Sequence, residues 1–383
     1  MKRMRTACDY TSPMTAPAPP QELVLVHDYL LVMRGAERTF AAMADLYERA
    51  PVFTLLYDES GTQGRFAGHR VTSSPLQRLG VGQDGFRRLM ALYPWAVERL
   101  RLPDTELVLS SSSAFAHGVR VPPGAVHVCY CYTPFRYAWY EQERALAELP
   151  APLRPLLRLE LARIRRWDLR AAGRVDSYIA ISELSRARIS RYLGRESVVI
   201  HPPVETHRFS PAEPGPALLV VSELVRHKRL EVALEAARRA GAPIQVVGSG
   251  PDHEALAAAY PQAEFLGRAG DERLASLYAR ARAVLVPSTE EFGIVAVEAQ
   301  AAGRPVIAAA AGGALETILD GRTGRLVAAD DIDAFAAAIR GLDELDFDPA
   351  EAVANAARFS VERFQAQLAE HLREARAAGP RRG

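Results

Sequence analysis

AVLVPSTEEFGIVAVEAQAAGRPVIAAA, residues 283–310, is the stretch that decides the fold. It begins and ends with short apolar runs, 283–288 and 305–310, whose length and composition are typical of strands buried on both faces. A helical pattern follows Phe292 and occupies the space between the two runs. The stretch therefore predicts two parallel strands joined by a helix, the unit from which parallel sheets covered by helices are built.

The same alternation continues on both sides of this stretch. Further strand-like runs lie at 23–28, 106–111, 126–132, 176–182, 217–222, 244–250 and 263–267. Helical patterns are expected at about 229–240, 252–259 and 271–281. We therefore predict an α/β protein with two Rossmann-like, doubly wound parallel-sheet domains. Ligands of such sheets bind at the carboxyl ends of the strands, so two domains that face each other create a binding cleft.

A proline-rich segment marks the boundary between the two domains. Five prolines lie between Pro202 and Pro216, and they exclude a helix or an interior strand there. The last strong helical pattern, 360–376, follows the second domain and is expected to cross back to the first. The predicted organisation is a disordered tail at 1–20, an N-terminal domain at 21–200, a linker at 201–216, a C-terminal domain at 217–359, and a returning helix with a short tail at 360–383.

Composition places the chain among ordinary soluble proteins. Of its 383 residues 49% are hydrophobic and 24% charged, and the formal net charge is +1, so a nucleic-acid partner is not expected. The three cysteines, Cys8, Cys129 and Cys131, are too few for a disulfide framework and too poorly spaced for a zinc site. No apolar stretch is long enough to span a bilayer, and residues 1–20 lack the apolar core of a signal peptide. These features predict a cytoplasmic protein.

The loop and helix start at 288–298 form the first candidate site. A helix that begins just after a strand presents free N–H groups, here those of residues 292–294, which suit a diphosphate. Glu290 in the loop is then placed to accept hydrogen bonds from sugar hydroxyls, and Glu298, two turns along the helix, from a ribose. The spacing alone also fits a surface cluster that caps the helix, so both interpretations stay open at this point.

Basic residues form the second candidate site. The segment SELVRHKRLE (222–231) ends a strand and begins a helix, and it brings Arg226, Lys228 and Arg229 close together. Two phosphates on a departing nucleotide need fixed cations, which Lys228 and Arg226 are expected to provide. Arg229 is expected to be a solvated residue at the helix start.

The Glu290 to Glu298 element, with Phe-Gly-Ile-Val inside it, resembles the most specific motif of the retaining glycosyltransferases of family 4. Further segments are similar to this family in order and spacing, among them HDYLLVMRGAER (27–38), YTPFRYAWY (132–140), HPPVETHRF (201–209), VVGSGP (246–251) and GGALETILDGRTGRLV (312–327). The resemblance implies the GT-B fold and transfer, with retention, of a sugar from a nucleoside-diphosphate donor. It implies a hydroxyl acceptor on a glycan, a lipid-linked precursor or a small molecule, and no metal or other cofactor.

The same resemblance makes mannose the preferred sugar, with GDP-mannose as donor and a UDP-linked sugar as the alternative. Carried onto this chain, the family motifs predict the catalytic residues Glu290, Lys228, Arg226 and Tyr132. They predict as donor-binding residues Glu298, Phe292, Gly293, Ile294, Val295, Gly35, Ala36, Gly248 and Gly250.

Four residues depart from the family pattern. Tyr132 and Ser113 stand where relatives often have His, Glu223 where they have Arg, and Ala36 where they have a second Gly. These departures keep open the alternative of a catalytically silent GT-B protein that binds a donor or a partner as an accessory subunit. Among enzymes the alternative is a GT-B nucleotide-sugar epimerase, which would need acid/base carboxylates.

Residues 85–103, GFRRLMALYPWAVERLRLP, mix four arginines with large apolar side chains. This composition suits an interfacial helix on anionic lipid, which predicts peripheral contact with the inner face of the cell membrane. An amphipathic helix of the core, with a solvated basic face, fits the composition equally well.

Several smaller features have structural interpretations. His27 and Asp28 end a strand, where a cleft-lining role and a structural role are both open. Asp331 in DDIDAF is predicted to cap a helix rather than to bind a metal. Cys129 and Cys131 are predicted to be small buried residues on one face of a strand.

Overall fold

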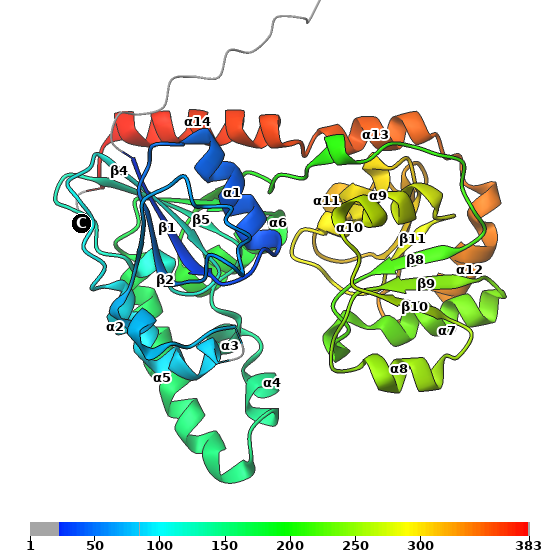
Figure 1. The fold of residues 1–383 in the computed structure, drawn as a ribbon, viewed down its shortest axis with the longest axis horizontal. Coiled ribbons are helices and arrows are strands. Elements are labelled where there is room, and N and C mark those ends of the chain that lie inside the picture. The colour runs from blue at the N-terminus through cyan, green and yellow to red at the C-terminus, as the bar shows by residue number, and fades with distance from the viewer. Residues whose placement is uncertain (1–22, 84, 382–383) are drawn as a thin grey trace, which may run out of the picture.

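A computed structural model describes residues 23–83 and 85–381. Two parallel sheets organise this part of the chain (Figure 1). The first has seven strands in the order β3-β2-β1-β4-β5-β6-β7. Their bounds are β1 Leu23–Leu30, β2 Val52–Tyr57, β3 Val71–Ser73, β4 Leu107–Ser112, β5 Val126–Cys131, β6 Ser177–Ala180 and β7 Ser197–Val199. The central strands β1, β4 and β5 are buried along nearly their whole length.

The second sheet has six strands in the order β10-β9-β8-β11-β12-β13. Their bounds are β8 Leu218–Val221, β9 Ile244–Val247, β10 Glu264–Gly267, β11 Val284–Val286, β12 Val306–Ala309 and β13 Gly324–Val327. Every strand pair in both sheets is parallel, so the predicted doubly wound α/β fold with two Rossmann-like domains is confirmed.

Helices cover both faces of each sheet and bury its apolar side chains (Figure 1). Those that accompany the first sheet are α1 Gly35–Leu46, α2 Tyr93–Val97, α3 Arg136–Trp139, α4 Gln142–Ala147, α5 Arg154–Ala172 and α6 Glu183–Arg188. Those that accompany the second are α7 Leu230–Ala240, α8 His253–Ala259, α9 Asp271–Arg280, α10 Ile294–Ala301, α11 Ala314–Thr317, α12 Ile332–Arg340 and α13 Pro349–Ala357.

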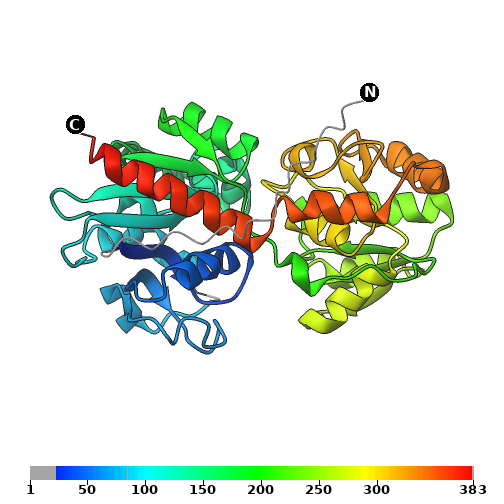
Figure 2. The same ribbon diagram turned by 90° about the horizontal axis from the view of Figure 1, so that it is seen from above.

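The last helix, α14 (Val361–Ala378), lies along the first domain rather than the second (Figure 2). The Phe364 ring packs edge-on against Tyr130 of β5, with 5.6 Å between the ring centroids. Gln365 donates a hydrogen bond to the carbonyl of Ala42 in α1. The chain thus crosses between the domains twice, once between β7 and β8 and once between α13 and α14.

The single helix predicted over residues 85–103 is wrong. A 3₁₀ helix at Phe86–Leu92 is followed by the short helix α2, and no helix continues beyond it to residue 103. Pro94 explains the break, because proline fits the first turn of a new helix but not the interior of a longer one. Leu92 and Trp95 stay exposed, whereas Tyr93 is buried.

Two of the smaller predictions are confirmed. The Asp331 side chain accepts a hydrogen bond from the N–H of Ala334 and caps α12. Cys129 and Cys131, both residues of β5, are buried in one apolar cluster. The predicted tail at 1–20, with Cys8, lies outside the described residues. None of the helices in residues 23–83 and 85–381 is long and apolar enough to cross a membrane.

Candidate functional site

Glu290 and Lys228 come from different loops of the second domain and form an ion pair. Glu290 follows β11, and Lys228 ends a 3₁₀ turn, Arg226–Lys228, that follows β8. The Nζ atom of Lys228 lies 2.8 and 2.7 Å from the two carboxylate oxygens of Glu290. The Ser288 hydroxyl donates a further hydrogen bond to Glu290, at 2.5 Å. Neighbouring parallel strands end at the same edge of the sheet, which explains how residues 62 positions apart meet.

Two glycines set the shape of the loop that carries Glu290. A Cβ atom on Gly312 would lie 2.2 Å from the carbonyl oxygen of Glu290, and one on Gly313 would lie 2.0 Å from that of Phe292. The N–H of Gly313 donates to the Glu290 carbonyl at 2.9 Å. Only glycine permits this approach of two backbones. Our prediction did not name these glycines as site residues, although their pairing after a strand was a usable signal.

The N-termini of two helices face each other across the domain boundary. Gly35 is the first residue of α1 and Ile294 the first of α10. A Cβ atom on Gly35 would lie 3.1 Å from the Cδ1 atom of Ile294. Gly293 precedes α10 with φ at 93°, a conformation that favours glycine. Both helices direct their free N–H groups and positive dipole ends toward this junction, and Phe292 to Val295 lie at the start of α10.

Glu298 lies inside α10 and is held by a buried tyrosine. The hydroxyl of Tyr278, in α9, donates to Glu298 at 2.7 Å. Burial raises the pKa of Glu298, while the Tyr278 hydroxyl and the charge of Arg208 oppose the rise. Arg208 in turn lies in a network with Arg38 of α1, since both contact Asp271 at the start of α9. Nothing in the local sequence predicts Tyr278, because its partner lies in another helix.

The remaining predicted donor-binding residues lie around these groups. A Cβ atom on Gly248 would lie 1.8 Å from the Ser222 carbonyl, and one on Gly250 would lie 2.2 Å from that of Leu224. Both glycines therefore allow the loop after β9 to pack against the loop that leads to Lys228. Arg226 is exposed at the start of that 3₁₀ turn. Arg229 is paired with Asp330 and Glu231, as expected of a residue at a solvated helix start.

Tyr132 is part of a buried network in the first domain. Its hydroxyl donates to the carbonyl of Ala36 at 2.8 Å and lies 3.0 Å from the Ser111 hydroxyl. Burial raises the pKa of Tyr132 above its usual value, so the phenol stays neutral. Since Ala36 is the second residue of α1, this contact fixes the helix N-terminus that faces Ile294.

His27 and Asp28 have structural contacts. The His27 ring stacks on Phe40 and hydrogen-bonds to Ser111, and burial lowers its pKa to about 4 despite the nearby charge of Asp28. The Asp28 carboxylate accepts hydrogen bonds from the backbone N–H groups of residues 113–116 and from the Ser113 hydroxyl. Ser113, where relatives often have His, thus serves to anchor the loop after β4.

Glu37 stands in the first turn of α1, at the same junction. Its carboxylate accepts a hydrogen bond from the N–H of Arg34 at 3.1 Å, which closes the start of the helix. Burial raises the pKa of Glu37 to about 7, against the opposing effect of the hydrogen bonds from its own N–H and that of Arg34.

The raised pKa of Glu37 predicts a pH-dependent effect of Glu37→Gln. The unfolded chain ionises this carboxyl at the usual pKa of 4.5, whereas the folded chain keeps the proton up to about pH 7. The carboxyl therefore lowers stability increasingly between these two values and by a constant amount above them. Glu37→Gln should raise the free energy of unfolding by about 1–3 kcal/mol near pH 8 and leave it unchanged near pH 4. Urea unfolding at the two pH values checks this, and an equal effect at both would contradict it.

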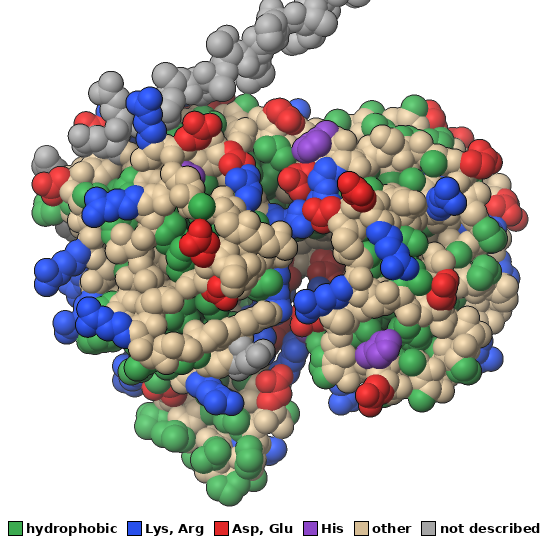
Figure 3. All heavy atoms as spheres, viewed as in Figure 1, with side chains coloured by type: hydrophobic (Ala, Val, Ile, Leu, Met, Phe, Trp, Pro, Cys, Tyr) green, Lys and Arg blue, Asp and Glu red, His purple; other side chains and the backbone are tan. Residues whose placement is uncertain are grey.

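Charged side chains of both domains meet at their junction (Figure 3). Arg188 at the end of α6 pairs with Glu291, beside Glu290, at 3.2 Å and stacks on the Tyr140 ring. Arg144 lies 2.9 Å from Nδ1 of His227, the neighbour of Lys228. Burial and the charges of Arg144 and Lys228 lower the pKa of His227. The first domain therefore presents a basic wall to the loops that carry Glu290 and Lys228.

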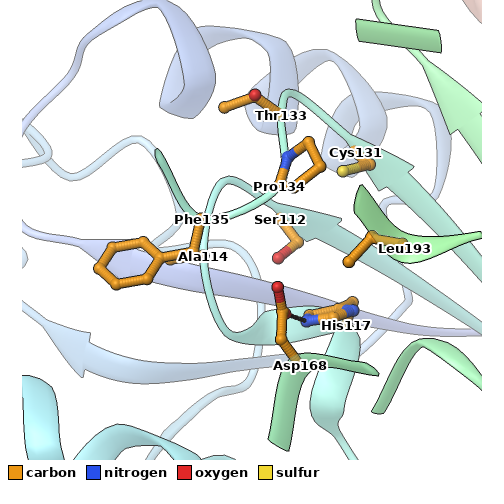
Figure 4. A pocket seen from close by; sticks show the side chains of 9 residues that line it. All are labelled: Ser112, Ala114, His117, Cys131, Thr133, Pro134, Phe135, Asp168 and Leu193. Atoms are coloured by element: carbon orange, nitrogen blue, oxygen red, sulfur yellow. Dashed lines mark ion pairs between the residues drawn. The ribbon is translucent and has the colours of Figure 1, made fainter. Parts of the chain in front are cut away.

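A second polar cluster lies inside the first domain, at the carboxyl ends of β4 and β5 (Figure 4). The buried His117 ring pairs with Asp168 at 2.7 Å and hydrogen-bonds to the Tyr178 hydroxyl at 2.9 Å. Burial lowers the pKa of His117, but Asp168 outweighs it and the net pKa lies above its usual value. Trp139 donates to the second carboxylate oxygen of Asp168. With its partners provided internally, this cluster is a structural network.

Within residues 23–83 and 85–381 no group of three or more His, Cys, Asp or Glu side chains is arranged to hold a metal ion.

Comparison with known proteins finds similarity over part of the chain. Residues 215–344 match the family described as Glycosyl transferases group 1. The D-inositol 3-phosphate glycosyltransferase of Mycolicibacterium paratuberculosis is 34% identical over 188 residues, which is 42% of this chain and 42% of that protein. The enzyme of the same name from Streptomyces coelicolor is 48% identical over 82 residues, 21% of this chain and 18% of that protein. The matched stretches thus span less than half the length of these relatives.

Solved structures show the same fold over nearly the full chain. Anabaena Alr3699/HepE in complex with UDP has a TM-score of 0.70 at 20% identity, covering 92% of this chain and 100% of that one. Sucrose-phosphate synthase from Thermosynechococcus elongatus has a TM-score of 0.69 at 20% identity, covering 94% and 100%. Residues 215–344 are therefore similar to the group 1 glycosyl transferases, and the chain as a whole has the two-domain GT-B fold of these solved structures.

Proposed function

We propose that this protein is a glycosyltransferase that moves a hexose, with retention, from a nucleoside-diphosphate sugar to a hydroxyl acceptor. The observation that carries the proposal is the Lys228–Glu290 pair, with nitrogen to oxygen distances of 2.7 and 2.8 Å, beside the N-terminus of α10. A cation, a carboxylate and free helix N–H groups are the three partners that a diphosphate sugar requires. The family match of residues 215–344 supports the same conclusion.

The positive charge at this place suits a leaving diphosphate. The N-termini of α1 and α10 and the side chains of Lys228 and Arg226 would stabilise the negative charge that develops as the bond to phosphate breaks. An ammonium group has three N–H donors, so Lys228 can bond to Glu290 and to a phosphate oxygen together. The loop glycines Gly248 and Gly250 would border the nucleotide.

The sugar itself would lie against Glu290. Its carboxylate can accept hydrogen bonds from sugar hydroxyls and hold the anomeric carbon toward the cleft. The acceptor hydroxyl attacks that carbon on the face from which the phosphate leaves. The new carbon–oxygen bond forms as the old one breaks, and a donor phosphate oxygen takes the proton, so the nucleoside diphosphate is released and the configuration is retained.

Tyr132 is assigned a positioning role in this scheme. The sequence predicts it as a catalytic residue, but its neutral phenol is engaged by Ala36 and Ser111. It would act by holding the start of α1 against the donor phosphates. Where related sequences have a histidine, Tyr132 would hold the backbone at the start of α1 instead of contacting the sugar.

The donor is tested by a panel of GDP- and UDP-linked hexoses. The family resemblance favours GDP-mannose, whereas one protein of the same fold, Anabaena Alr3699/HepE, has been solved with UDP and with UDP-glucose. Release of nucleoside diphosphate with a glycosylated acceptor, and with the anomeric configuration of the donor, is the expected result. Tight nucleotide-sugar binding without transfer or hydrolysis would show a silent accessory protein, and an isomerised donor would show an epimerase.

Glu298 is expected to hold the nucleotide ribose, because it lies about one turn inside the helix that begins at the phosphate position. Glu298→Ala should weaken nucleotide binding by about 1.5–3 kcal/mol, the range for a hydrogen bond to a charged group. Tyr278→Phe should give a smaller loss, since it removes only the hydroxyl that orients Glu298. Titration calorimetry with GDP and UDP measures both variants, and unchanged affinity in a folded Glu298→Ala protein would remove this role.

A further inference from the structure

The tip of the hairpin formed by α4 and α5 exposes large apolar side chains. Leu156 is 67% exposed and Leu159 is 64% exposed, and both lie in the first two turns of α5. Leu153, just before the helix, is 49% exposed. Figure 1 shows this end of α5 projecting away from the first sheet, and Figure 3 shows hydrophobic side chains gathered at the projecting end. Leucines three residues apart share one face of a helix, so the tip forms a continuous apolar surface.

The rest of α5 is strongly basic. The helix contains six arginines, at positions 154, 158, 163, 165, 166 and 170. Its acidic residues are Glu160, which pairs with Arg163, and the buried Asp168. Glu148, just after α4, is partnered by Arg144, and Glu143 is an exposed acidic residue within α4. Arg158 is exposed between Leu156 and Leu159, and Arg166 is exposed about two turns beyond Leu159.

A second apolar element lies beside the basic turns of α5. The Arg163 guanidinium donates to the carbonyl of Ala91, which places the segment before α2 against this helix. Leu92 at the end of that segment and Trp95 of α2 are exposed, and Arg99 stacks on the Trp95 ring at 4.8 Å from its centroid. Apolar side chains with arginines around them thus occur on both elements.

We propose that the α5 tip docks the protein on an anionic lipid surface, with Leu153, Leu156 and Leu159 inserted among the lipids. The rise of about 1.5 Å per residue places Arg163 about 10 Å above Leu156 along the helix. An apolar group that enters about 5–10 Å into the headgroup boundary therefore brings the arginines to the level of the lipid phosphates. The charge of α5 matches that surface.

A second copy of this chain fits the tip less well. A two-fold contact through the tip would place the same helix of both copies together. It would thereby bring two sets of arginines into proximity, with only Glu160 to compensate them. The lipid surface satisfies the leucines and the arginines together.

Vesicle co-sedimentation with the full-length protein tests the proposal. Wild type should bind phosphatidylcholine vesicles that contain phosphatidylglycerol, bind pure phosphatidylcholine far less, and be released by salt because exposed charges are screened beyond about 10 Å at 0.1 M. The double variant Leu156→Ser with Leu159→Ser should lower the partition coefficient at least about tenfold. Arg158→Glu with Arg166→Glu should abolish the preference for the anionic vesicles.

Leu169→Ser is the matched control, because Leu169 is 47% exposed on the same helix but far from the tip. It should bind vesicles as wild type does. All the replaced side chains are exposed, so the melting temperature should stay near that of wild type. Equal binding by wild type and the tip variant, or no preference for anionic lipid, would overturn the proposal. A dimer in solution that the tip variant dissociates would identify a second copy as the occupant instead. None of these measurements depends on the proposed transferase activity.

Discussion

Glu290→Gln is expected to lower turnover by about 10²-fold or more while nucleotide affinity stays close to that of wild type. The substitution keeps the size of the side chain but removes the charge that pairs with Lys228 at 2.7 Å and accepts from Ser288. Loss of one preorganised polar group commonly costs this much in the reacting state. The contacts assigned to the ribose and the diphosphate, at Glu298 and the start of α10, are left intact.

Steady-state transfer and calorimetry on the same preparation separate these effects. Glu272→Gln is the matched control, since Glu272 is an exposed carboxylate of α9 in the same domain. It should leave both quantities unchanged. If Glu290→Gln lost nucleotide affinity and turnover in parallel, Glu290 would belong to the nucleotide site and its assignment to the sugar would fail.

Asp28→Ala is expected to lower the free energy of unfolding by about 3–5 kcal/mol, the range of the most damaging single substitutions. The Asp28 carboxylate accepts from the N–H groups of Ser113, Ala114, Phe115 and Ala116 at 2.6 to 3.0 Å. Its removal leaves several buried donors without a partner, and each such group costs about 1–3 kcal/mol before relaxation. The loss reflects structure rather than chemistry, so nucleotide affinity of the folded fraction should be unchanged.

Two further variants make this measurement interpretable. Asp28→Asn keeps one acceptor oxygen and should cost less, which provides a value even if the alanine variant fails to fold. Asp331→Ala removes an exposed helix cap with one backbone hydrogen bond and should cost about 1 kcal/mol. If Asp28→Ala were no worse than Asp331→Ala, the loop after β4 would be held by other contacts.

The sequence was sufficient for the fold because the fold depends on local patterns. Short apolar strands such as β8 and β9, separated by the amphipathic helix α7, specify parallel pairing without knowledge of any tertiary contact. The stretch 283–310 folds as strand, helix and strand, in register with its neighbours. Helix caps such as Asp331 were equally predictable, since a cap acts within three residues.

Composition alone does not predict how long a helix is or where it breaks. Residues 85–103 have the residues of an amphipathic helix, but Pro94 starts a new helical turn and buries Tyr93 while exposing Trp95. The exposure of the α5 tip is not predicted by the sequence either. Its leucines have the spacing of an ordinary buried helix face, and only the projection of the hairpin leaves them without a partner.

The chemistry of the candidate site was decided by tertiary contacts. The sequence placed Glu290 and Lys228 at two strand ends, and the sheet order brought them together because β8 and β11 are adjacent. From the sequence, Tyr132 is predicted to be a catalytic group in the cleft. In the structure its hydroxyl instead donates to the carbonyl of Ala36. The Tyr278 contact with Glu298 had no sequence signal. Side-chain partners far apart in the chain follow from how whole elements pack, whereas strands and helices follow from the periodicity of neighbouring residues.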